Sequence, residues 1–140
     1  KNGEKKIVAF YNESGKSWTP ICSQDSDGYV INAFAGTFDG GNHSIKGLYI
    51  NTETGREQGL FGIVSGTVKN LSVEGEVTAS SVVGGIAGFN RSNIAVCKNS
   101  GKVICTDGFA GGVVGYLLSG VLNNCTYSNK EGELQQRTKR

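Results

Sequence analysis

The residues of this chain that could do acid–base chemistry are few and spread out. Glu74 and Glu76 are two positions apart, so they would share one face of a strand, and Asp107 follows in a later loop. Glycoside hydrolysis needs two carboxyl groups that face each other across about 5 to 10 Å. Acidic residues on the solvent side of a strand also discourage aggregation at a sheet edge. The pattern favours this second role, and no catalytic residue is predicted.

The single histidine offers no stronger case for catalysis. His43 ends the run Asp39-Gly40-Gly41-Asn42-His43, which is typical of a turn between two strands. We expect Asp39 to cap this turn through its own backbone and His43 to be exposed. The sequence has no second histidine and no Gly-x-Ser-x-Gly phrase, so neither a metal site nor a nucleophilic triad is predicted.

Cofactor and metal sites are not indicated elsewhere. Asp25 and Asp27 lack the later acidic ligand of a calcium loop and predict an ordinary turn. No zinc-like spacing occurs among the cysteines, which we expect to be free thiols acting as small apolar residues. A disulfide between Cys97 and Cys125 is the alternative, since they are equivalent in the repeat described below, although parallel side-chain directions work against it. The four cysteines are Cys22, Cys97, Cys105 and Cys125.

Charge and hydropathy argue against two classes of partner. The net charge is +2, and the ionisable groups between residues 59 and 125 have mixed signs. No basic face that could neutralise several phosphates is predicted, and so no binding of nucleic acid. The small basic tail of Arg137, Lys139 and Arg140 suits a frayed terminus equally well. No apolar run approaches the 18 residues of a membrane helix, so no membrane insertion is predicted.

A repeated β element must position all of these side chains. A phrase of Gly, an aliphatic residue, an apolar residue and Gly begins at Gly59, Gly85 and Gly112. Repeats of 26 to 27 residues predict the turns of a solenoid, in which equivalent residues stack at about 4.8 Å. We expect glycine to permit bends and close approach of layers, with Gly62, Gly88 and Gly115 in structural roles. Alternation leaves open which residue between the glycines faces inward.

The apolar residues after each phrase extend the match. An offset of 26 aligns Val68 with Ile94, Leu71 with Cys97 and Val77 with Val103. One residue inserted near Ser119-Gly120 brings Leu122 and Cys125 onto Ile94 and Cys97. An offset of 23 aligns an earlier partial copy, Ile45, Leu48 and Ile50, with Val68, Leu71 and Val73.

The motifs resemble those of a known family. Gly59-Leu60-Phe61-Gly62, the run Phe34-Ala35-Gly36-Thr37-Phe38-Asp39-Gly40-Gly41-Asn42-His43-Ser44-Ile45-Lys46-Gly47-Leu48 and the upstream Trp18-Thr19-Pro20-Ile21 resemble GLUG repeats over residues 18 to 128. GLUG repeats belong to bacterial surface and secreted proteins. The resemblance implies a right-handed parallel β-helix in adhesin-like proteins, or beside the catalytic part of some immunoglobulin-A-cleaving peptidases. It supplies no catalytic residues.

The predicted fold is all-β, a right-handed parallel β-helix (β-solenoid) of about four coils. Residues 1–34 would form an aromatic-rich N-terminal strand and cap segment, and residues 35–128 the coils. Residues 129–140 would be a polar tail, either a short helix or disordered. We expect one domain and a longer parent protein.

The predicted function is that of a non-catalytic module of a bacterial cell-surface or secreted protein, for adhesion or as a rigid spacer. Its partners would be a protein or glycan on a host or matrix surface, and further repeats or domains of the parent chain. Tyr49, Tyr116 and Tyr127 could stack on such ligands, although packed positions in a sheet also account for them. The alternatives are a polysaccharide-active β-helix enzyme and an accessory domain of a secreted immunoglobulin-A-type peptidase.

Overall fold

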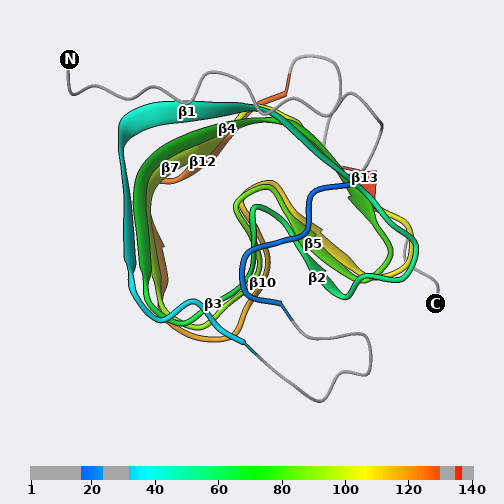
Figure 1. The fold of residues 1–140 in the computed structure, drawn as a ribbon, viewed down its shortest axis with the longest axis horizontal. Helices are drawn as coiled ribbons and strands as arrows, with labels where there is room; N and C mark the ends of the chain where they lie inside the picture. The colour runs from blue at the N-terminus through cyan, green and yellow to red at the C-terminus, as the bar shows by residue number, and fades with distance from the viewer. Residues whose placement is uncertain (1–16, 24–31, 130–134, 137–140) are drawn as a thin grey trace.

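The computed structural model describes residues 17–23, 32–129 and 135–136, and in these ranges the chain contains strands and no helix. It forms a parallel β-solenoid of about three turns (Figure 1). The prediction of an all-β solenoid is therefore confirmed. The strands are β1 (Thr37–Asn51), β2 (Glu57–Gln58), β3 (Phe61–Val64), β4 (Thr67–Ala79), β5 (Val82–Gly84), β6 (Ala87–Asn90), β7 (Asn93–Asn99), β8 (Lys102–Cys105), β9 (Phe109–Gly111), β10 (Val114–Leu117), β11 (Val121–Asn123), β12 (Thr126–Tyr127) and β13 (Gln135–Gln136).

Three parallel sheets form the sides of the solenoid. The long sheet contains β1, β4, β7, β8, β11, β12 and β13, and two three-stranded sheets are ordered β10-β6-β3 and β2-β5-β9. In Figure 1 the long sheet bends around the left and top of the ring, while the other two sheets fold inward to its middle. Each turn therefore has an indented outline.

The apolar ladders of the core follow the predicted offset of 26 residues. Val68 pairs with Ile94, and Val77 with Val103, in the register of β4 with β7 and β8. Leu122 pairs with Ile94, which confirms the one-residue insertion in the last copy. Val68 and Ile94 are both fully buried, because each has a neighbouring turn on both sides.

The predicted offset of 23 for the first copy is wrong. Ile45 pairs with Val73, and Phe38 is the residue that pairs with Val68. The register of β1 shifts between Asp39 and His43 and again between Ile45 and Leu48, so β1 uses more residues than β4 over the same path. The run from Asp39 to His43 is thus a bulge within one strand and not a turn between two strands.

The glycine phrases lie where the two short sheets fold inward and approach each other. A Cβ on Gly88 would lie 2.6 Å from the backbone nitrogen of Gln58, and one on Gly115 would lie 2.7 Å from that of Val83. Neither glycine has a positive φ, so close approach of the backbone requires them. At the inner corner both Leu60 and Phe61 are buried, which answers the question that alternation left open.

One position of the long sheet has a left-handed backbone in every turn. Asn42, Asn70 and Asn124 have φ between 55° and 65°, and Val96 occupies the equivalent position with φ 54°. Such a residue redirects an extended strand, which fits the bend of the long sheet in Figure 1. Asparagine tolerates this conformation, whereas a β-branched residue is strained in it. We did not predict this position, although asparagine before the ladder residue in three turns was the available signal.

The described parts of the N-terminal segment lie on the first turn. Ile21 makes a parallel bridge to Phe61, and Phe34 to Val64. The rings of Phe34 and Phe38 lie 5.1 and 5.5 Å from that of Phe61. Other aromatic residues assigned to the cap, Phe10, Tyr11 and Tyr29, lie outside the described residues, so the aromatic cap and the count of four coils stay predictions.

The C-terminal tail differs from the prediction in the part that the structure describes. Gln135 and Gln136 form strand β13, which pairs with Ile104 and Cys105 of β8. This short segment is neither helical nor without structure. The remainder of the tail after Asn129, including the basic residues Arg137, Lys139 and Arg140, lies outside the described residues.

Candidate binding surface

The outer face of the long sheet presents aligned rows of polar side chains. Along β4 the buried residues alternate with more exposed ones, so Ser72 and Glu76 point outward between the inward Leu71, Val73 and Val77. The parallel register then places equivalent outward residues of successive turns beside one another. We call this surface the polar face.

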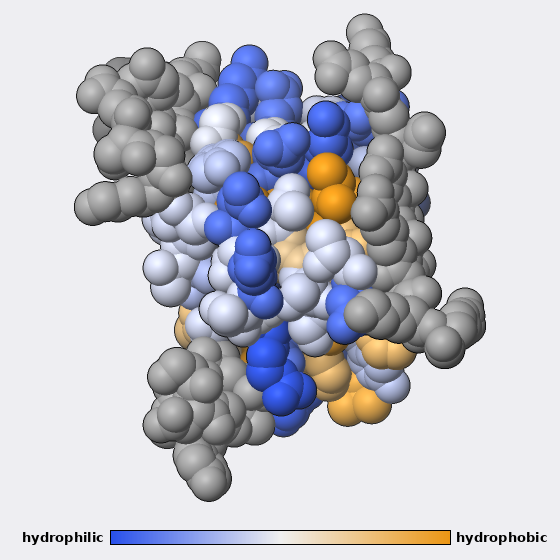
Figure 2. All heavy atoms as spheres, turned by 90° about the vertical axis from the view of Figure 1, so that its right-hand side faces the viewer, coloured by the Kyte–Doolittle hydropathy of each residue, from blue (hydrophilic) through white to orange (hydrophobic). Residues whose placement is uncertain are grey.

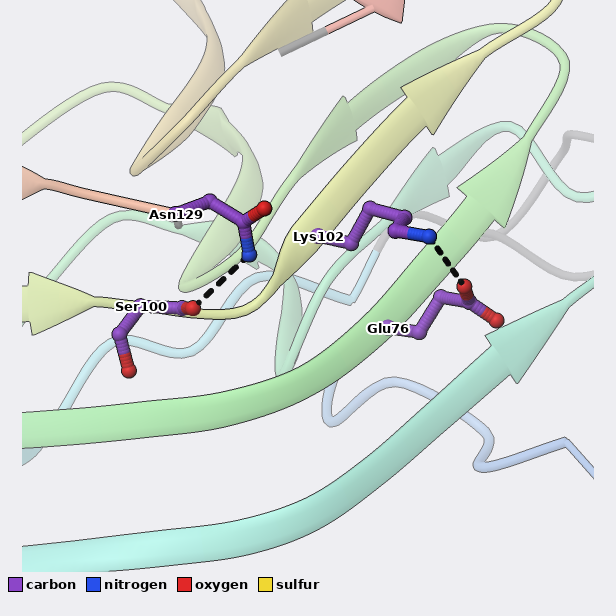
Figure 3. A network of polar contacts seen from close by, with 4 residues as sticks. All are labelled: Glu76, Ser100, Lys102 and Asn129. Atoms are coloured by element: carbon purple, nitrogen blue, oxygen red, sulfur yellow. Dashed lines mark hydrogen bonds and ion pairs between the residues drawn. The ribbon is translucent and has the colours of Figure 1, made fainter. Parts of the chain in front are cut away.

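One row of the polar face combines an aromatic ring with a pair of opposite charges. Tyr49 of β1 pairs with Glu76 of β4, which pairs with Lys102 of β8. The Nζ atom of Lys102 lies 3.7 Å from Oε2 of Glu76, and both side chains are about two-fifths exposed (Figure 3). The hydroxyl of Tyr49 accepts a hydrogen bond of 3.2 Å from the amide of Asn51. The row offers a ring, a carboxylate and an ammonium group to one ligand.

A second row of the polar face carries small hydroxyl groups and a lysine. Ser44, Ser72, Lys98 and Thr126 occupy equivalent positions of β1, β4, β7 and β12. Lys98 and Thr126 are exposed, and the two serines are half-buried. Hydroxyl and ammonium groups are donors that a polar polymer could engage. We did not predict the rows, although the offset of 26 brings Ser72 to Lys98 and was the available signal; the place of Ser44 depends on the shifted register of β1.

The acidic residues considered for catalysis are separated along the long sheet. Glu76 is paired with Lys102, and Glu74 is exposed on the same strand. Asp107 follows Cys105, whose partner Ala79 is already about 10 Å along β4 from Glu76 at 3.3 Å per residue. The structure therefore places Asp107 beyond the end of β4 and not beside the glutamates.

The bulge of β1 surrounds a small hollow at the first turn. His43 is half-buried there and not exposed as predicted, because it continues the strand and pairs with Leu71. Asp39 accepts hydrogen bonds of 3.0 Å from the backbone of Gly41 and from the side chain of Asn70. The first contact confirms the predicted cap, and the two bonds, that from Asn70 foremost, lower the pKa of Asp39. The hollow, about 200 Å³, is lined by Phe38, Asp39, Gly40, His43, Ser44, Ile45 and Leu71.

The cysteines are free thiols, as predicted. Cys97 and Cys105 are buried, whereas Cys22 and Cys125 are half-buried. Burial raises the pKa of Cys97 to about 11, so this thiol is a poor nucleophile at neutral pH. Cys97 and Cys105 belong to the core, and Cys125 packs against it.

Metal and membrane sites find no support in the described part of the chain. Within residues 17–23 and 32–129, no three His, Cys, Asp or Glu side chains are grouped so that they could hold a metal ion. Asp25 and Asp27 lie outside the described residues. The described segments also contain no helix that could span a membrane.

The last turn exposes large apolar side chains. The ring of Tyr116 stacks on that of Phe89 at 5.4 Å, meets that of Phe109 edge-on at 5.6 Å, and is 39% exposed. Tyr127, by contrast, packs against the core. Tyr116 is thus half-packed, which agrees with the alternative that the tyrosines occupy packed positions in a sheet. The side chains that we call the carboxy-end surface are Phe109, Tyr116, Leu117, Leu118, Val121 and Leu122.

The side of the solenoid next to β2 and β13 has a different character. Figure 2 shows it to be mainly polar across its middle, with apolar atoms gathered toward its right and lower margins. Strand β2 carries a buried acid, Glu57, whose side chain is 6% exposed and has Oε2 at 3.6 Å from Nε of Arg56. Burial raises the pKa of this carboxyl, and the charge of Arg56 offsets part of that effect.

Comparison with known proteins gives two distant relatives. The chain is 33% identical over 90 residues to a protein of Evansella cellulosilytica named as a Gly-rich membrane protein, covering 60% of this chain and 10% of the relative. It is 31% identical over 104 residues to halomucin of Haloquadratum walsbyi, covering 72% of this chain and 1% of that protein. The chain thus spans a tenth or less of these relatives. No family model matches it, and no solved structure matches it significantly.

Proposed function

We propose that the chain is a non-catalytic, GLUG-type module of a bacterial cell-surface or secreted protein, and that its polar face adheres to a glycan or protein of a host or matrix surface. The observation that supports adhesion is the alignment of Tyr49, Glu76 and Lys102 in one row on a rigid sheet. The names of the two relatives, a Gly-rich membrane protein and a halomucin, support a location at or outside the cell surface.

The finer architecture belongs to the same proposal. A right-handed helix of about four coils would span residues 35–128, with residues 1–34 as its cap and residues 129–140 as its tail. The parent protein would contain further repeats or domains, as the greater length of both relatives suggests. With no outside ligand, the module would still serve as a rigid spacer.

The polar face suits a polar polymer for a physical reason. Outward side chains of neighbouring turns lie about 4.8 Å apart, so an extended ligand can contact several turns at once. The ring of Tyr49 offers an apolar surface for a sugar ring, while Lys98 and Lys102 offer hydrogen bonds. Because the strands already fix the backbone, binding costs only the conformational entropy of the side chains that make contact.

Binding of the purified chain to arrays of glycans, mucin and matrix proteins tests the proposal. Changing Tyr49→Ala should weaken binding about 5- to 30-fold, the range of an interface residue that matters. Lys46→Ala is the matched control, because Lys46 is exposed on the same strand but belongs to neither row. Absence of binding to every surface would overturn adhesion and leave only the spacer role.

Assays of released reducing sugar on the same glycans address catalysis. We expect none. Release that disappears in Glu74→Gln or Glu76→Gln would identify a polysaccharide-active enzyme and contradict the proposal.

A further inference from the structure

The carboxy-end surface continues ladders that are buried in the earlier turns. Ile94 is fully buried, but Leu122, which pairs with it in the next turn, is 37% exposed. Asn90 is fully buried, whereas its partner Leu117 is 44% exposed. Leu117 and Leu122 therefore occupy positions that are buried in the preceding turn, and they are exposed because the described residues place no turn on their other side.

The strands at this end also have an open edge. In the described part of the chain, β10 ends the order β10-β6-β3, and β11 begins the order of the long sheet. Open edges are commonly protected by charged residues or proline. Residues 108–129 contain no Asp, Glu, Lys, Arg, His or Pro. Nothing in this stretch opposes the addition of another strand.

The outline of the turn restricts what can be added. The edges of β10 and β11 belong to different sheets, and the two short sheets fold inward while the long sheet bends around them (Figure 1). A partner that pairs with both edges must follow the same indented path in the same direction. Only a turn of the same kind meets this condition.

We propose that the carboxy-end surface is an interface that receives one further β-solenoid turn in parallel register. The added turn would place an apolar side chain on Leu122, as Ile94 lies on Val68, and a side chain on the ring of Tyr116, as Tyr116 stacks on Phe89. This interface extends the stacking already present between the turns. The proposed interface does not depend on adhesion, so a screen that finds no glycan ligand would not contradict it.

An extended variant of the full chain tests the interface. A copy of residues 76–101 is inserted after Asn129, where the register continues because Tyr127 pairs with Asn99. Peptides from residues 109–123 occur once in this variant, so their hydrogen exchange reports the original last turn. We expect amides of β10 and β11 to exchange at least about tenfold more slowly, and the melting temperature to rise.

A blocked variant is the matched control. Leu117→Asp with Leu122→Asp should leave the unextended chain folded, because the two side chains are 44% and 37% exposed there, whereas an added turn would bury both positions as Asn90 and Ile94 are buried. In the extended chain the same changes should abolish the slowing of exchange and the rise in melting temperature. The proposal would be overturned if the extended chain without the Asp substitutions showed unchanged hydrogen exchange in residues 109–123.

Sedimentation of the unextended chain tests whether a second copy of the chain occupies the carboxy-end surface. We expect a monomer over a wide range of concentration. A dimer that protects β10 and β11 and is abolished by Leu122→Asp would show that a second copy occupies the surface, and would overturn the assignment to a further turn.

Discussion

The two ends of the stack differ in what lies on them. The first turn is partly covered by Ile21 and Phe34 and carries the charged residues Asp39 and Lys46 on β1. The last turn exposes apolar side chains and has no charged residue between positions 108 and 129. Burial in a solenoid thus depends on having a neighbour on each side as well as on the residue type. Within the described residues, the first turn has partial cover, whereas the last turn presents apolar side chains at positions that are buried in the turn before it.

The largest expected effect compares the middle of the stack with the last turn. Ile94→Ala removes a fully buried side chain and should lower the free energy of unfolding by about 2 to 5 kcal/mol. Leu122→Ala, at the equivalent and partly exposed position, should cost less than about 1 kcal/mol. Denaturant titration measures both, and equal losses would mean that the last turn is covered.

A second prediction concerns the close approach of the short sheets. Gly88→Ala places a Cβ 2.6 Å from the backbone nitrogen of Gln58, so the backbone must move, and we expect a loss of about 1 to 3 kcal/mol. Gly36→Ala at the amino end is the control. There the new Cβ would lie 3.5 Å from the ring of Phe34, an ordinary contact. Thermal unfolding that is equally affected in both variants would contradict this account of the glycine phrase.

Strain at the bend of the long sheet gives a smaller effect of opposite sign. Val96→Asn should stabilise the chain by about 1 kcal/mol, since asparagine tolerates φ near 54° and Val96 is 48% exposed. Asn70→Val at the equivalent position of the preceding turn should destabilise it by a similar amount and also removes the hydrogen bond to Asp39. A rise in melting temperature in the first variant and a fall in the second would confirm the pair.

The smallest expected effect concerns the buried acid near the amino end. Glu57 pairs with Val82, which pairs with Phe109, so the later turns are uncharged at this position. Because folding raises the pKa of Glu57, the folded state holds its proton at a pH where the unfolded state has lost it. Stability relative to Glu57→Gln should therefore fall as the pH rises above about 4.5 and level off above the folded pKa. Urea titrations of both proteins between pH 4 and 8 measure this difference, and a constant difference would contradict it.

Much of the fold could be predicted because stacked turns repeat the same residue types at one spacing. The offset of 26 alone identifies the partners of Val68 and Leu71. The first turn could not be aligned correctly, since the bulges of β1 add residues that change neither composition nor alternation. The exposed turn position predicted for His43 is wrong for the same reason. In the polar face the same offset of 26 joins Glu76 to Lys102, whereas Tyr49 could not be placed beside Glu76 because the register of β1 is shifted.

The bulge of β1 makes this position suitable for carrying a foreign sequence. From Asp39 to His43 the strand takes four steps while its partner takes two, from Lys69 to Leu71. Extra residues are therefore accommodated on the surface, and pairing resumes unchanged beyond them. A short epitope or affinity tag grafted between Gly41 and Asn42, both exposed, would be displayed at a fixed place on a stiff support, which makes the module a natural scaffold for vaccine or biosensor design.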